Sequence, residues 1–433
     1  MIKQDLELRE YLEIEGGYQL SGTVEISGAK NSALPNMAAT LLTDEEVILE
    51  NLPSLLDVFT MEKLLKFIGS DIKKIASGTY SFKLSTINSL QAPYELVSKM
   101  RASILVLGPM LSRFKYAKVS LPGGCSIGTR PVDLHLKALE KMGADIKVEH
   151  GYIIARANSG LKGTEINFDK ITVTGTENIM MAAVLAEGTT VINNAAKEPE
   201  VVDLAKMLKK MGADIKGEGT STIVVKGVKR LKGTVHRIIP DRIEAGTFAV
   251  LSALFDGKIV IKNYPNEYLD YVNYTLRKIG IHVIPLGKDE VYIKKERNLK
   301  PVFIETKEYP LFPTDLQAQF MTLLSVVKGQ SKIKENIFEN RFMHVPELKR
   351  LGADIKIEGR TAIINGVDKL SGAEVKATDL RASAAMVIAG LIAEGTTRIY
   401  DIYHLDRGYE DIDTKLKMLG AKIKRGVEKG SKL

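Results

Sequence analysis

A chain of 433 residues is too long for one ordinary hydrophobic core, so we expect at least two domains. With 45% hydrophobic and 26% charged residues, the composition is that of a folded globular protein and excludes a disordered or fibrous one. The single cysteine, Cys125, excludes an internal disulfide and a cysteine-based zinc site, and it is typical of a reducing compartment.

The chain carries no targeting signal that we can identify. Residues 1–7 alternate in charge and lack the apolar core of a signal peptide, and no apolar run is long enough to cross a bilayer. We therefore expect a cytoplasmic protein with no membrane partner. The net charge of +8 is compatible with a nucleic acid, an acidic surface or a small anionic substrate. Because the lysines are spread along the chain without a dense basic block, we expect no nucleic-acid partner.

One phrase, Gly-Ala-Asp-Ile-Lys or a variant of it, recurs six times along the chain. Its glycines lie 68 to 74 residues apart, and a steady period over six copies indicates repeated structural units. The glycines are Gly69, Gly143, Gly212, Gly280, Gly352 and Gly420.

Each repeat predicts the same succession of elements. A short strand opens it, as at residues 22–26, 163–166, 233–235 and 372–375. A helix that is apolar almost all round follows, and helices without a polar face are buried. These helices are expected at residues 104–111, 179–186, 248–254 and 382–393. A β-branched strand, an amphipathic helix that ends at the recurrent glycine, and two closing strands complete the unit.

The predicted order is therefore β-α-β-α-β-β, six times over. Three buried helices can share one core, so we expect two domains of three repeats each. The repeats place the break between them near residues 229–231, and the polar tail at residues 425–433 is expected to be frayed.

The cysteine lies in a glycine-rich loop, residues 121–131, that leads into a helix. Gly123, Gly124 and Gly128 allow the backbone to approach a ligand closely, and the helix is expected to end before Gly143. A helix N-terminus and Arg130 would both lower the pKa of the Cys125 thiol, which favours the reactive thiolate. The alternative is a small buried apolar cysteine without a chemical role.

Charged residues gather where the buried helices are expected to begin. Lysine and arginine there oppose the helix dipole, so an anion held between them would explain their presence. The alternative is mutual pairing, since buried charges must be paired. The helix starts in question carry Lys30 and Asn31, Arg101, Glu177 and Asn178, Asp241 with Arg242 and Glu244, Thr314 and Asp315, and Asp379 with Arg381.

Motifs along nearly the whole chain resemble the bacterial UDP-N-acetylglucosamine enolpyruvyl transferases, members of the enolpyruvyl transferase family. They are the motifs at residues 27–31, 101–103, 122–125, 128–135, 240–244, 312–315, 339–343, 379–382 and 406–410. The resemblance implies a two-domain inside-out α/β barrel-like fold of six β-α-β-α-β-β units, three per domain. It also implies that the N-terminal strand returns to the second domain. The domains are then residues 1–29 with 240–433, and residues 30–239. The active site is implied to lie between the domains and to close when the sugar nucleotide binds.

The same resemblance implies the substrates and the site residues. The substrates are phosphoenolpyruvate and UDP-N-acetylglucosamine, and no cofactor or metal is implied. Lys30 and Asn31 would contact phosphoenolpyruvate, Arg130 would lie near its phosphate, and Arg381 and Arg407 near its carboxylate. The catalytic set would be Cys125, Asp315, Lys30 and Arg407. Residues expected at the sugar nucleotide or elsewhere in the substrate site are Arg101, Arg130, Pro131, Val132, Asp133, Leu134, Asp315, Ile337, Arg341 and Asp379. The linker at residues 155–159 departs from the diphosphate-binding segment of the family.

The implied reaction requires these residue types on chemical grounds as well, apart from the resemblance. Protonation of an enol ether carbon needs a positioned acid, and attack by a sugar hydroxyl needs a base. Cys125 and Asp315 could fill these roles, and a poised thiol also attacks the neighbouring carbon that the sugar hydroxyl attacks, which would give a covalent adduct. We expect inactivation by fosfomycin, which alkylates the matching cysteine in the family. The alternatives are an enolpyruvylshikimate phosphate synthase and a non-catalytic nucleotide-sugar binder, with an RNA-binding repeat protein more distant. The sequence leaves the oligomeric state open, and a monomer is compatible with it.

Overall fold

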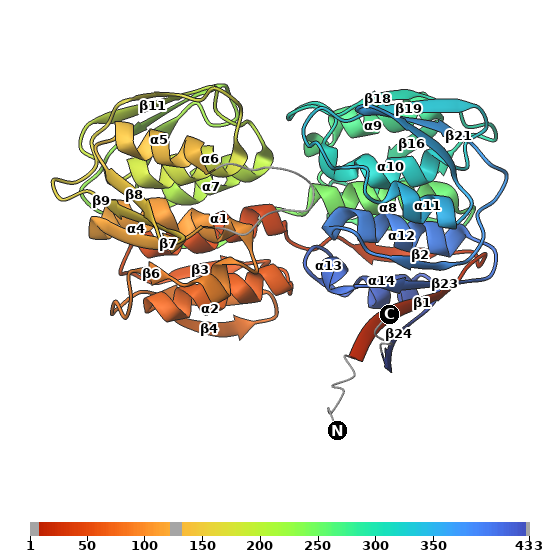
Figure 1. Ribbon diagram of the computed structural model, residues 1–433, viewed down its shortest axis with the longest axis horizontal. Helices are drawn as coiled ribbons and strands as arrows, with labels where there is room; N and C mark the ends of the chain where they lie inside the picture. The colour runs from red at the N-terminus through yellow and green to blue at the C-terminus, as the bar shows by residue number, and fades with distance from the viewer. Residues whose placement is uncertain (1–7, 122–131, 430–433) are drawn as a thin grey trace. The chain divides into compact units, whose positions relative to one another are not determined.

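The computed structural model describes residues 8–121 and 132–429, and the chain divides into two compact units. The N-terminal unit begins at Ser27 and ends at Pro240, and the C-terminal unit combines residues up to Ile26 with those from Asp241 onward. The domain boundaries expected at residues 29/30 and 239/240 stay a prediction. Figure 1 traces the chain through both units.

Each unit contains three four-stranded sheets, so that six sheets in all match the six repeats within the described residues. In every sheet a parallel pair is extended by antiparallel strands. In the N-terminal unit the sheet orders are β14-β3-β5-β4, β6-β7-β9-β8 and β10-β11-β13-β12. Its strands are β3 (Val47–Glu50), β4 (Asp71–Ala76), β5 (Thr79–Lys83), β6 (Gln91–Ala92), β7 (Tyr116–Ser120), β8 (Asp145–Glu149), β9 (Tyr152–Arg156), β10 (Glu165–Asn167), β11 (Thr189–Asn193), β12 (Asp214–Lys216), β13 (Thr222–Lys226) and β14 (Thr234–Arg237).

The helices of the N-terminal unit lie between its sheets, and α6 contacts both α1 and α4 in the interior (Figure 1). Nine of the ten residues of α1 are buried, as expected for a helix without a polar face. The helices are α1 (Lys30–Ala39), η1 (Thr40–Leu42), α2 (Leu56–Ile68), α3 (Tyr94–Val97), η2 (Arg101–Val106), α4 (Leu107–Phe114), α5 (Asp133–Lys141), α6 (Val173–Ala183) and α7 (Pro199–Lys210).

The C-terminal unit repeats this plan with α8, α10 and α12 packed on one another at its centre and strands outside them (Figure 1). Its sheet orders are β16-β17-β15-β2, β18-β19-β21-β20 and β22-β23-β1-β24. Its strands are β1 (Leu8–Glu15), β2 (Gly22–Glu25), β15 (Ile259–Lys262), β16 (Ile281–Pro285), β17 (Glu290–Lys295), β18 (Phe303–Glu305), β19 (Gln330–Lys334), β20 (Asp354–Glu358), β21 (Thr361–Asn365), β22 (Glu374–Lys376), β23 (Thr396–Tyr400) and β24 (Lys422–Lys429). Its helices are α8 (Arg242–Leu254), η3 (Asn266–Tyr268), α9 (Asp270–Ile279), η4 (Thr314–Leu316), α10 (Gln317–Leu324), α11 (Val345–Arg350), α12 (Leu380–Ile392), α13 (Tyr403–Asp406) and α14 (Ile412–Met418).

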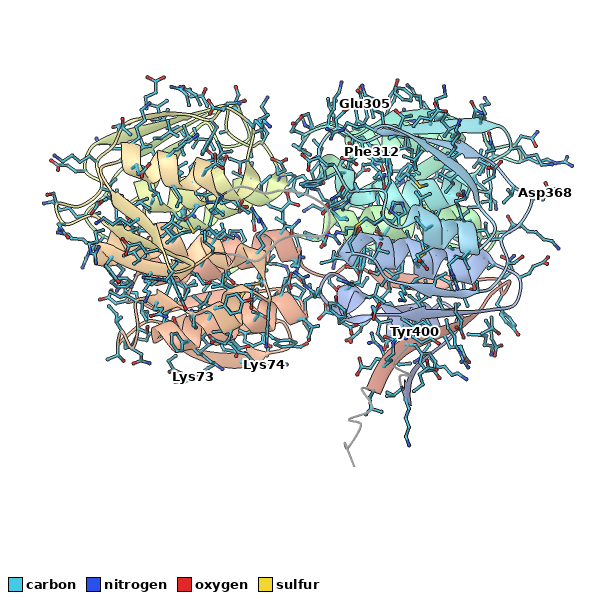
Figure 2. The ribbon with its side chains drawn as sticks, in the orientation of Figure 1. Lys73, Lys74, Glu305, Phe312, Asp368 and Tyr400 are labelled. Carbon is cyan, nitrogen blue, oxygen red and sulfur yellow. The ribbon has the colours of Figure 1, made fainter. Side chains whose placement is uncertain are left out.

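Apolar side chains fill the interior of the C-terminal unit, and charged ones cover its outside. Phe312 is fully buried and packs edge-on against Phe320, with 4.8 Å between the ring centroids. Figure 2 shows Phe312 inside the fold and Asp368 at its edge, where Asp368 is exposed. The two-domain α/β fold of six repeated units, expected from the sequence, is confirmed.

Two strands lie in other sheets than the repeats predict. The opening strand at residues 22–26 forms β2, but it pairs in parallel with β15 of the fourth repeat. The opening strand of the fourth repeat forms β14, which pairs in parallel with β3 of the first. The prediction that each repeat supplies its own opening strand is therefore wrong for these two. The two strands are exchanged between the units, and because both are short and contain Gly-Thr-Val, the local sequence does not decide which sheet each one joins.

The sixth sheet is completed by the beginning of the chain. Strand β1 lies between β23 and β24, antiparallel to both, and takes the place of a second closing strand. The prediction that residues from 425 onward are frayed is wrong as far as Lys429, because these residues pair with β1 from Leu8 to Leu12. Residues 430–433 lie outside the described residues.

The first and last segments of the N-terminal unit are joined to each other. The amide of Ala29 donates to the carbonyl oxygen of Ile239 at 2.7 Å, and Gly28 forms a β-bridge with Pro240. A Cβ atom at Gly28 would lie 1.8 Å from the carbonyl oxygen of Asn51, so only glycine fits there.

We expect Gly28→Ala to lower the free energy of unfolding by about 3 kcal/mol, because backbone atoms must move apart to admit the methyl group. Chemical denaturation of the purified variant measures this loss. Gly287→Ala is the matched control, since a Cβ there meets no atom within 4 Å. Equal stability of the two variants would contradict the close approach at Gly28.

Candidate functional site

In the N-terminal unit, the start of α1 carries the first candidate residues. Lys30 is only 8% exposed, and its Nζ lies 3.1 Å from Oδ2 of Asp57 on α2. The neighbouring Asn31 is exposed. Ala29, which precedes the helix, provides no side-chain cap for the amides of the first turn of α1. The site therefore offers a held ammonium group beside a helix N-terminus, a combination that suits an anion.

The candidates for the sugar nucleotide lie at the starts of two further helices. Arg101 begins η2, and Asp133 begins α5, with Val132 and Leu134 on either side of it; all four are half-buried. The Nζ of Lys137 lies 3.7 Å from Oδ2 of Asp133. The other carboxylate oxygen, Oδ1, is buried and has no hydrogen-bond partner in the described part of the chain. That oxygen is a hydrogen-bond acceptor still to be used.

The structure describes only residue 121 of the glycine-rich loop. Cys125, Arg130 and Pro131 lie outside the described residues, so their predicted roles stay predictions. The helix expected after the loop is α5, which ends at Lys141, two residues before Gly143 with its φ of +96°. This end of the helix matches the prediction.

In the C-terminal unit, one carboxylate is shared by two arginines from different repeats. Oδ1 of Asp315, in η4, lies 3.0 Å from Nη2 of Arg341, and Oδ2 lies 3.2 Å from Nε of Arg381. Both arginines are buried, at 4% and 3% exposure of the side chain, whereas that of Asp315 is 27% exposed. The two guanidinium groups fix the orientation of the carboxylate and leave part of it accessible.

Arg381 is held in place at the start of α12. Asp379 caps this helix, with its Oδ1 accepting from the amides of Arg381 at 2.8 Å and Ala382 at 3.0 Å. The guanidinium lies 5.3 Å from the ring centroid of Tyr409. Burial opposes its charge, but Tyr409 and the carboxylates of Asp315 and Asp241 raise its pKa above the usual range. Its Nη1 is buried without a hydrogen-bond partner among the described residues, so the two N–H groups of this nitrogen are left for a ligand.

Arg407 follows α13, and its segment lies against the start of α12, the helix that carries Arg381. A Cβ at the next residue, Gly408, would lie 2.4 Å from the side chain of Leu380, so this segment packs closely on α12. Arg407 is half-buried, and its charge contributes, after burial, to lowering the pKa of His404. Arg381 and Arg407 thus belong to two segments that pack together within one unit.

Ile337 lies in a turn built on a buried carboxylate. Glu335, which is 1% exposed, accepts from the amides of Ile337 at 2.9 Å and Phe338 at 3.1 Å. It also accepts from the hydroxyl of Thr306 at 2.9 Å and that of Thr314 at 3.0 Å. Sequence reasoning missed Glu335, because a single glutamate after a strand gives no signal that it will be buried. It connects the turn at Ile337 to η4, which carries Asp315.

Glu177 of α6 is another buried carboxyl group, and it is 1% exposed. Burial raises its pKa well above the ordinary value, and the nearby charges of Glu200 and Glu198 raise it further. The sequence pointed to a charge at this helix start but gave it no partner.

The linker at residues 155–159 runs from the end of β9 into a turn, where Asn158 and Ser159 are exposed.

Of the two explanations for the charged residues at helix starts, mutual pairing is observed for part of them. Lys30 pairs with Asp57, while Arg341 and Arg381 pair with Asp315, so mutual pairing accounts for part of the charge. The binding of an anion stays a prediction.

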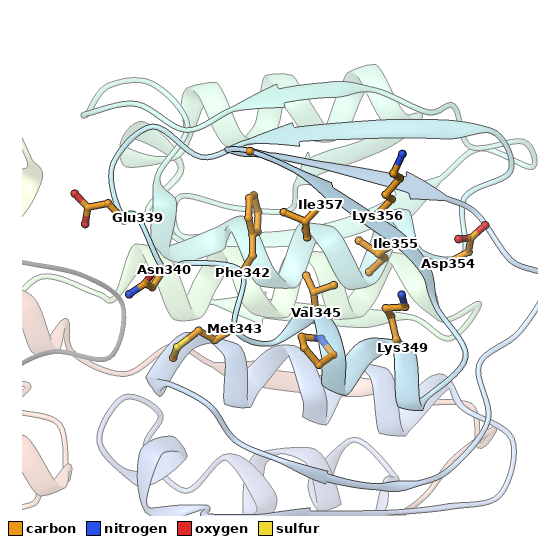
Figure 3. Close-up of a pocket in the computed structure, with 12 residues that line it drawn as sticks. Glu339, Asn340, Phe342, Met343, Val345, Lys349, Asp354, Ile355, Lys356 and Ile357 are labelled. Atoms are coloured by element: carbon orange, nitrogen blue, oxygen red, sulfur yellow. The ribbon is translucent and has the colours of Figure 1, made fainter.

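A hollow of about 900 Å³ lies beside the segment that carries Arg341 (Figure 3). Its lining includes Phe342, Met343 and Val345 on one side and Ile355 of β20 on the other. Asp315, Arg341 and Arg381 are not part of this lining. The hollow is therefore not the place where these three charged side chains meet.

The family match and the fold place this chain in a class of proteins, the carboxyvinyltransferases. Residues 14–416 match the family described as EPSP synthase (3-phosphoshikimate 1-carboxyvinyltransferase). The chain belongs to this family and is a transferase. A solved structure that resembles it is that of the enolpyruvyl transferase NikO from Streptomyces tendae, with a TM-score of 0.88 and 25% identity over 98% of this chain and 100% of the other.

Curated relatives with higher identity confirm the resemblance seen in the sequence. The UDP-N-acetylglucosamine 1-carboxyvinyltransferase 1 of Caldanaerobacter subterraneus subsp. tengcongensis is 56% identical, over 95% of this chain and 98% of the relative. The UDP-N-acetylglucosamine 1-carboxyvinyltransferase of Acidobacterium capsulatum is 53% identical, over 95% of each chain. Among the residues that the structure describes, no helix is long and apolar enough to cross a membrane.

Proposed function

We propose that this protein transfers the enolpyruvyl group of phosphoenolpyruvate to the 3-hydroxyl of UDP-N-acetylglucosamine and releases phosphate. This reaction is the first committed step of peptidoglycan precursor synthesis. The observation that carries the proposal is the similarity, at 53 to 56% identity over 95% of the chain, to enzymes named for this transfer. The arrangement of charges in each unit supports it.

The reaction needs an acid and a base, and Cys125 and Asp315 are our candidates. Attack of the sugar 3-oxygen on C2 of phosphoenolpyruvate forms a C–O bond, while C3 gains a proton. The resulting tetrahedral adduct then loses phosphate from C2 and a proton from C3, which restores the double bond. We propose that Asp315 accepts the proton of the sugar hydroxyl and that Cys125 donates the proton to C3. In a competing step, the Cys125 thiol gives its proton to C3 and its sulfur adds to C2, so that the double bond is replaced by a C–S and a C–H bond and the phosphate stays on C2 as a covalent adduct.

The cationic residues would balance the charges of the two substrates. In the C-terminal unit, Arg381 with its unused Nη1 and the neighbouring Arg407 suit the carboxylate of phosphoenolpyruvate. In the N-terminal unit, Lys30 and the polar Asn31 suit phosphoenolpyruvate, and Arg130 suits its phosphate group. Stabilisation of a developing anion by one such group is worth about 3 kcal/mol.

We assign the sugar nucleotide to another set of residues. Asp133 has a buried acceptor oxygen left for a ligand, and Arg101 supplies a positive charge at the start of η2. The remaining residues of this proposed substrate site are Pro131, Val132, Leu134, Ile337, Arg341 and Asp379.

A phosphate-release assay with two acceptors tests the proposal directly. We expect phosphate release from phosphoenolpyruvate with UDP-N-acetylglucosamine and none with shikimate 3-phosphate. The opposite result would favour an enolpyruvylshikimate phosphate synthase. Binding of the nucleotide sugar in calorimetry without any turnover would favour a non-catalytic binder. We also propose a cytoplasmic location, a role in cell division through the cell wall, and inactivation by fosfomycin.

A further inference from the structure

A buried amide on α6 links three other elements of the N-terminal unit. The side chain of Asn178 is fully buried, and its Oδ1 accepts from the backbone amide of Gly108 on α4 at 2.7 Å. Its Nδ2 donates to the carbonyl oxygen of Ile104 in η2 at 3.0 Å and lies 3.0 Å from Nδ1 of His135 on α5. One side chain thus bonds to η2, α4 and α5 at once.

These partners fix the protonation of His135. A backbone amide only donates and a carbonyl oxygen only accepts, so the oxygen of Asn178 must face Gly108 and its NH₂ group must face Ile104. The same NH₂ group faces Nδ1 of His135, which therefore accepts and carries no proton. The ring proton lies on Nε2, which is 3.3 Å from the hydroxyl oxygen of Thr174. Burial agrees with a neutral ring, because it lowers the pKa of His135 to about 4.

The elements that this amide links are those that carry the nucleotide-sugar candidates. Arg101 is the first residue of η2, and Asp133 is the first residue of α5, followed by Leu134. After burial, the charge of Arg101 lowers the pKa of His135 and that of Asp133 raises it, so both charged groups lie near the ring. A neutral link between η2 and α5 sets the spacing of Arg101 and Asp133 without adding a charge that would compete with either.

We propose that His135 and Asn178 are positioning residues for UDP-N-acetylglucosamine, an inference that rests on the function proposed above. They hold η2 and α5 in register, and through them they fix Arg101, Asp133 and Leu134. They act through these residues and not on the reacting atoms. Their loss should therefore weaken the binding of the nucleotide sugar. The binding of phosphoenolpyruvate and the rate of the chemical step should be largely unaffected.

Three substitutions of one residue separate positioning from bulk packing. In His135→Asn the amide oxygen replaces Nδ1 as the acceptor for Asn178, whereas His135→Gln places its amide near Nε2 and His135→Leu removes both bonds. We expect the KM and the calorimetric Kd for UDP-N-acetylglucosamine to rise about tenfold in the Gln and Leu variants, the effect of one lost hydrogen bond. The Asn variant should stay within about threefold of wild type, and the KM for phosphoenolpyruvate should hardly change in any of them.

A buried asparagine of the other unit gives the matched control. Asn273 on α9 accepts from the hydroxyl of Tyr264 at 2.7 Å and lies far along the chain from the candidate residues. Asn273→Ala should lower stability while leaving the KM for both substrates unchanged. If all the His135 variants kept the wild-type affinity, or if both KM values rose together, the positioning role would be wrong.

The ring tautomer supplies a second readout that needs no variant. In a ¹⁵N-labelled sample of the full chain at pH 7, His135 should show a protonated Nε2 and an unprotonated Nδ1. A doubly protonated ring would overturn the inference even if the leucine variant failed to fold. Wild-type protein that bound UDP-N-acetylglucosamine without phosphate release would overturn the proposed function alone, because the affinity comparison among the variants would still decide the positioning role.

Discussion

Asp315→Asn should lower kcat by a factor of about 10²–10⁴, the contribution of a positioned general base. Asparagine keeps the shape of the side chain and can still accept from Arg341 or Arg381, but it cannot take the proton of the sugar hydroxyl. The two arginines hold the carboxylate from both sides, at 3.0 Å and 3.2 Å, so the group is oriented before substrate arrives. Steady-state kinetics with both substrates saturating measures the loss.

A second aspartate in the same unit provides the control for this substitution. Asp413 is buried and, like Asp315, bonds to an arginine, with 3.0 Å between its Oδ1 and Nε of Arg425. Asp413→Asn should cost stability and leave kcat within about twofold of wild type. A wild-type kcat in the Asp315 variant would remove Asp315 from the role of base. An equal loss in both variants would indicate a structural effect.

Cys125→Ser should reduce turnover by a factor of at least about 10² while nucleotide-sugar binding persists. A serine hydroxyl is a far weaker acid than a thiol, so it cannot protonate C3 of phosphoenolpyruvate at neutral pH. Single-turnover phosphate release measures the chemical step, and calorimetry measures the binding. Undiminished turnover would reject Cys125 as the acid.

The same variant tests the reactivity of the thiol. Because the chain has one cysteine, any thiol-directed mass increase reports on Cys125 alone. Mass spectrometry should detect one fosfomycin adduct on the wild-type protein and none on the serine variant. An adduct on the serine variant would place the reactive group elsewhere.

Much of the fold could be predicted from the sequence because its repeats are local signals. The recurrent glycine ends a helix with a positive φ in each copy, as Gly143 and Gly352 do, and such positions are readable without a partner. The exchange of β2 and β14 was not readable, because both strands are short and have the same pattern. Which sheet they join depends on tertiary contacts that no local pattern encodes. The paired strand β24 looked like a frayed tail for a similar reason, since its side chains are mostly polar.

The candidate site could be predicted by residue type but not by partner. Charged residues at apolar helix starts singled out Lys30 and Arg381, which the structure shows buried and paired with carboxylates, while their roles stay predictions. The sequence did not reveal that the carboxylate of Asp315 pairs with two arginines. The three segments involved, which are η4, α12 and the turn that precedes α11, are brought together only by folding. Glu335 and the bonds of Asn178 were missed for the same reason: their importance lies in buried backbone groups of distant segments.

The pairing of β1 with β24 has a consequence for synthesis on the ribosome. All strands of the N-terminal unit have been made once Arg237 is added, whereas β1, made first, needs a partner that ends at Lys429. At roughly 5–20 residues per second, the interval between the synthesis of β1 and that of β24 is on the order of 20 to 80 s. Leu12 and Ile14, fully buried in the finished protein, therefore lack their partners in β24 until residues 422–429 have been made.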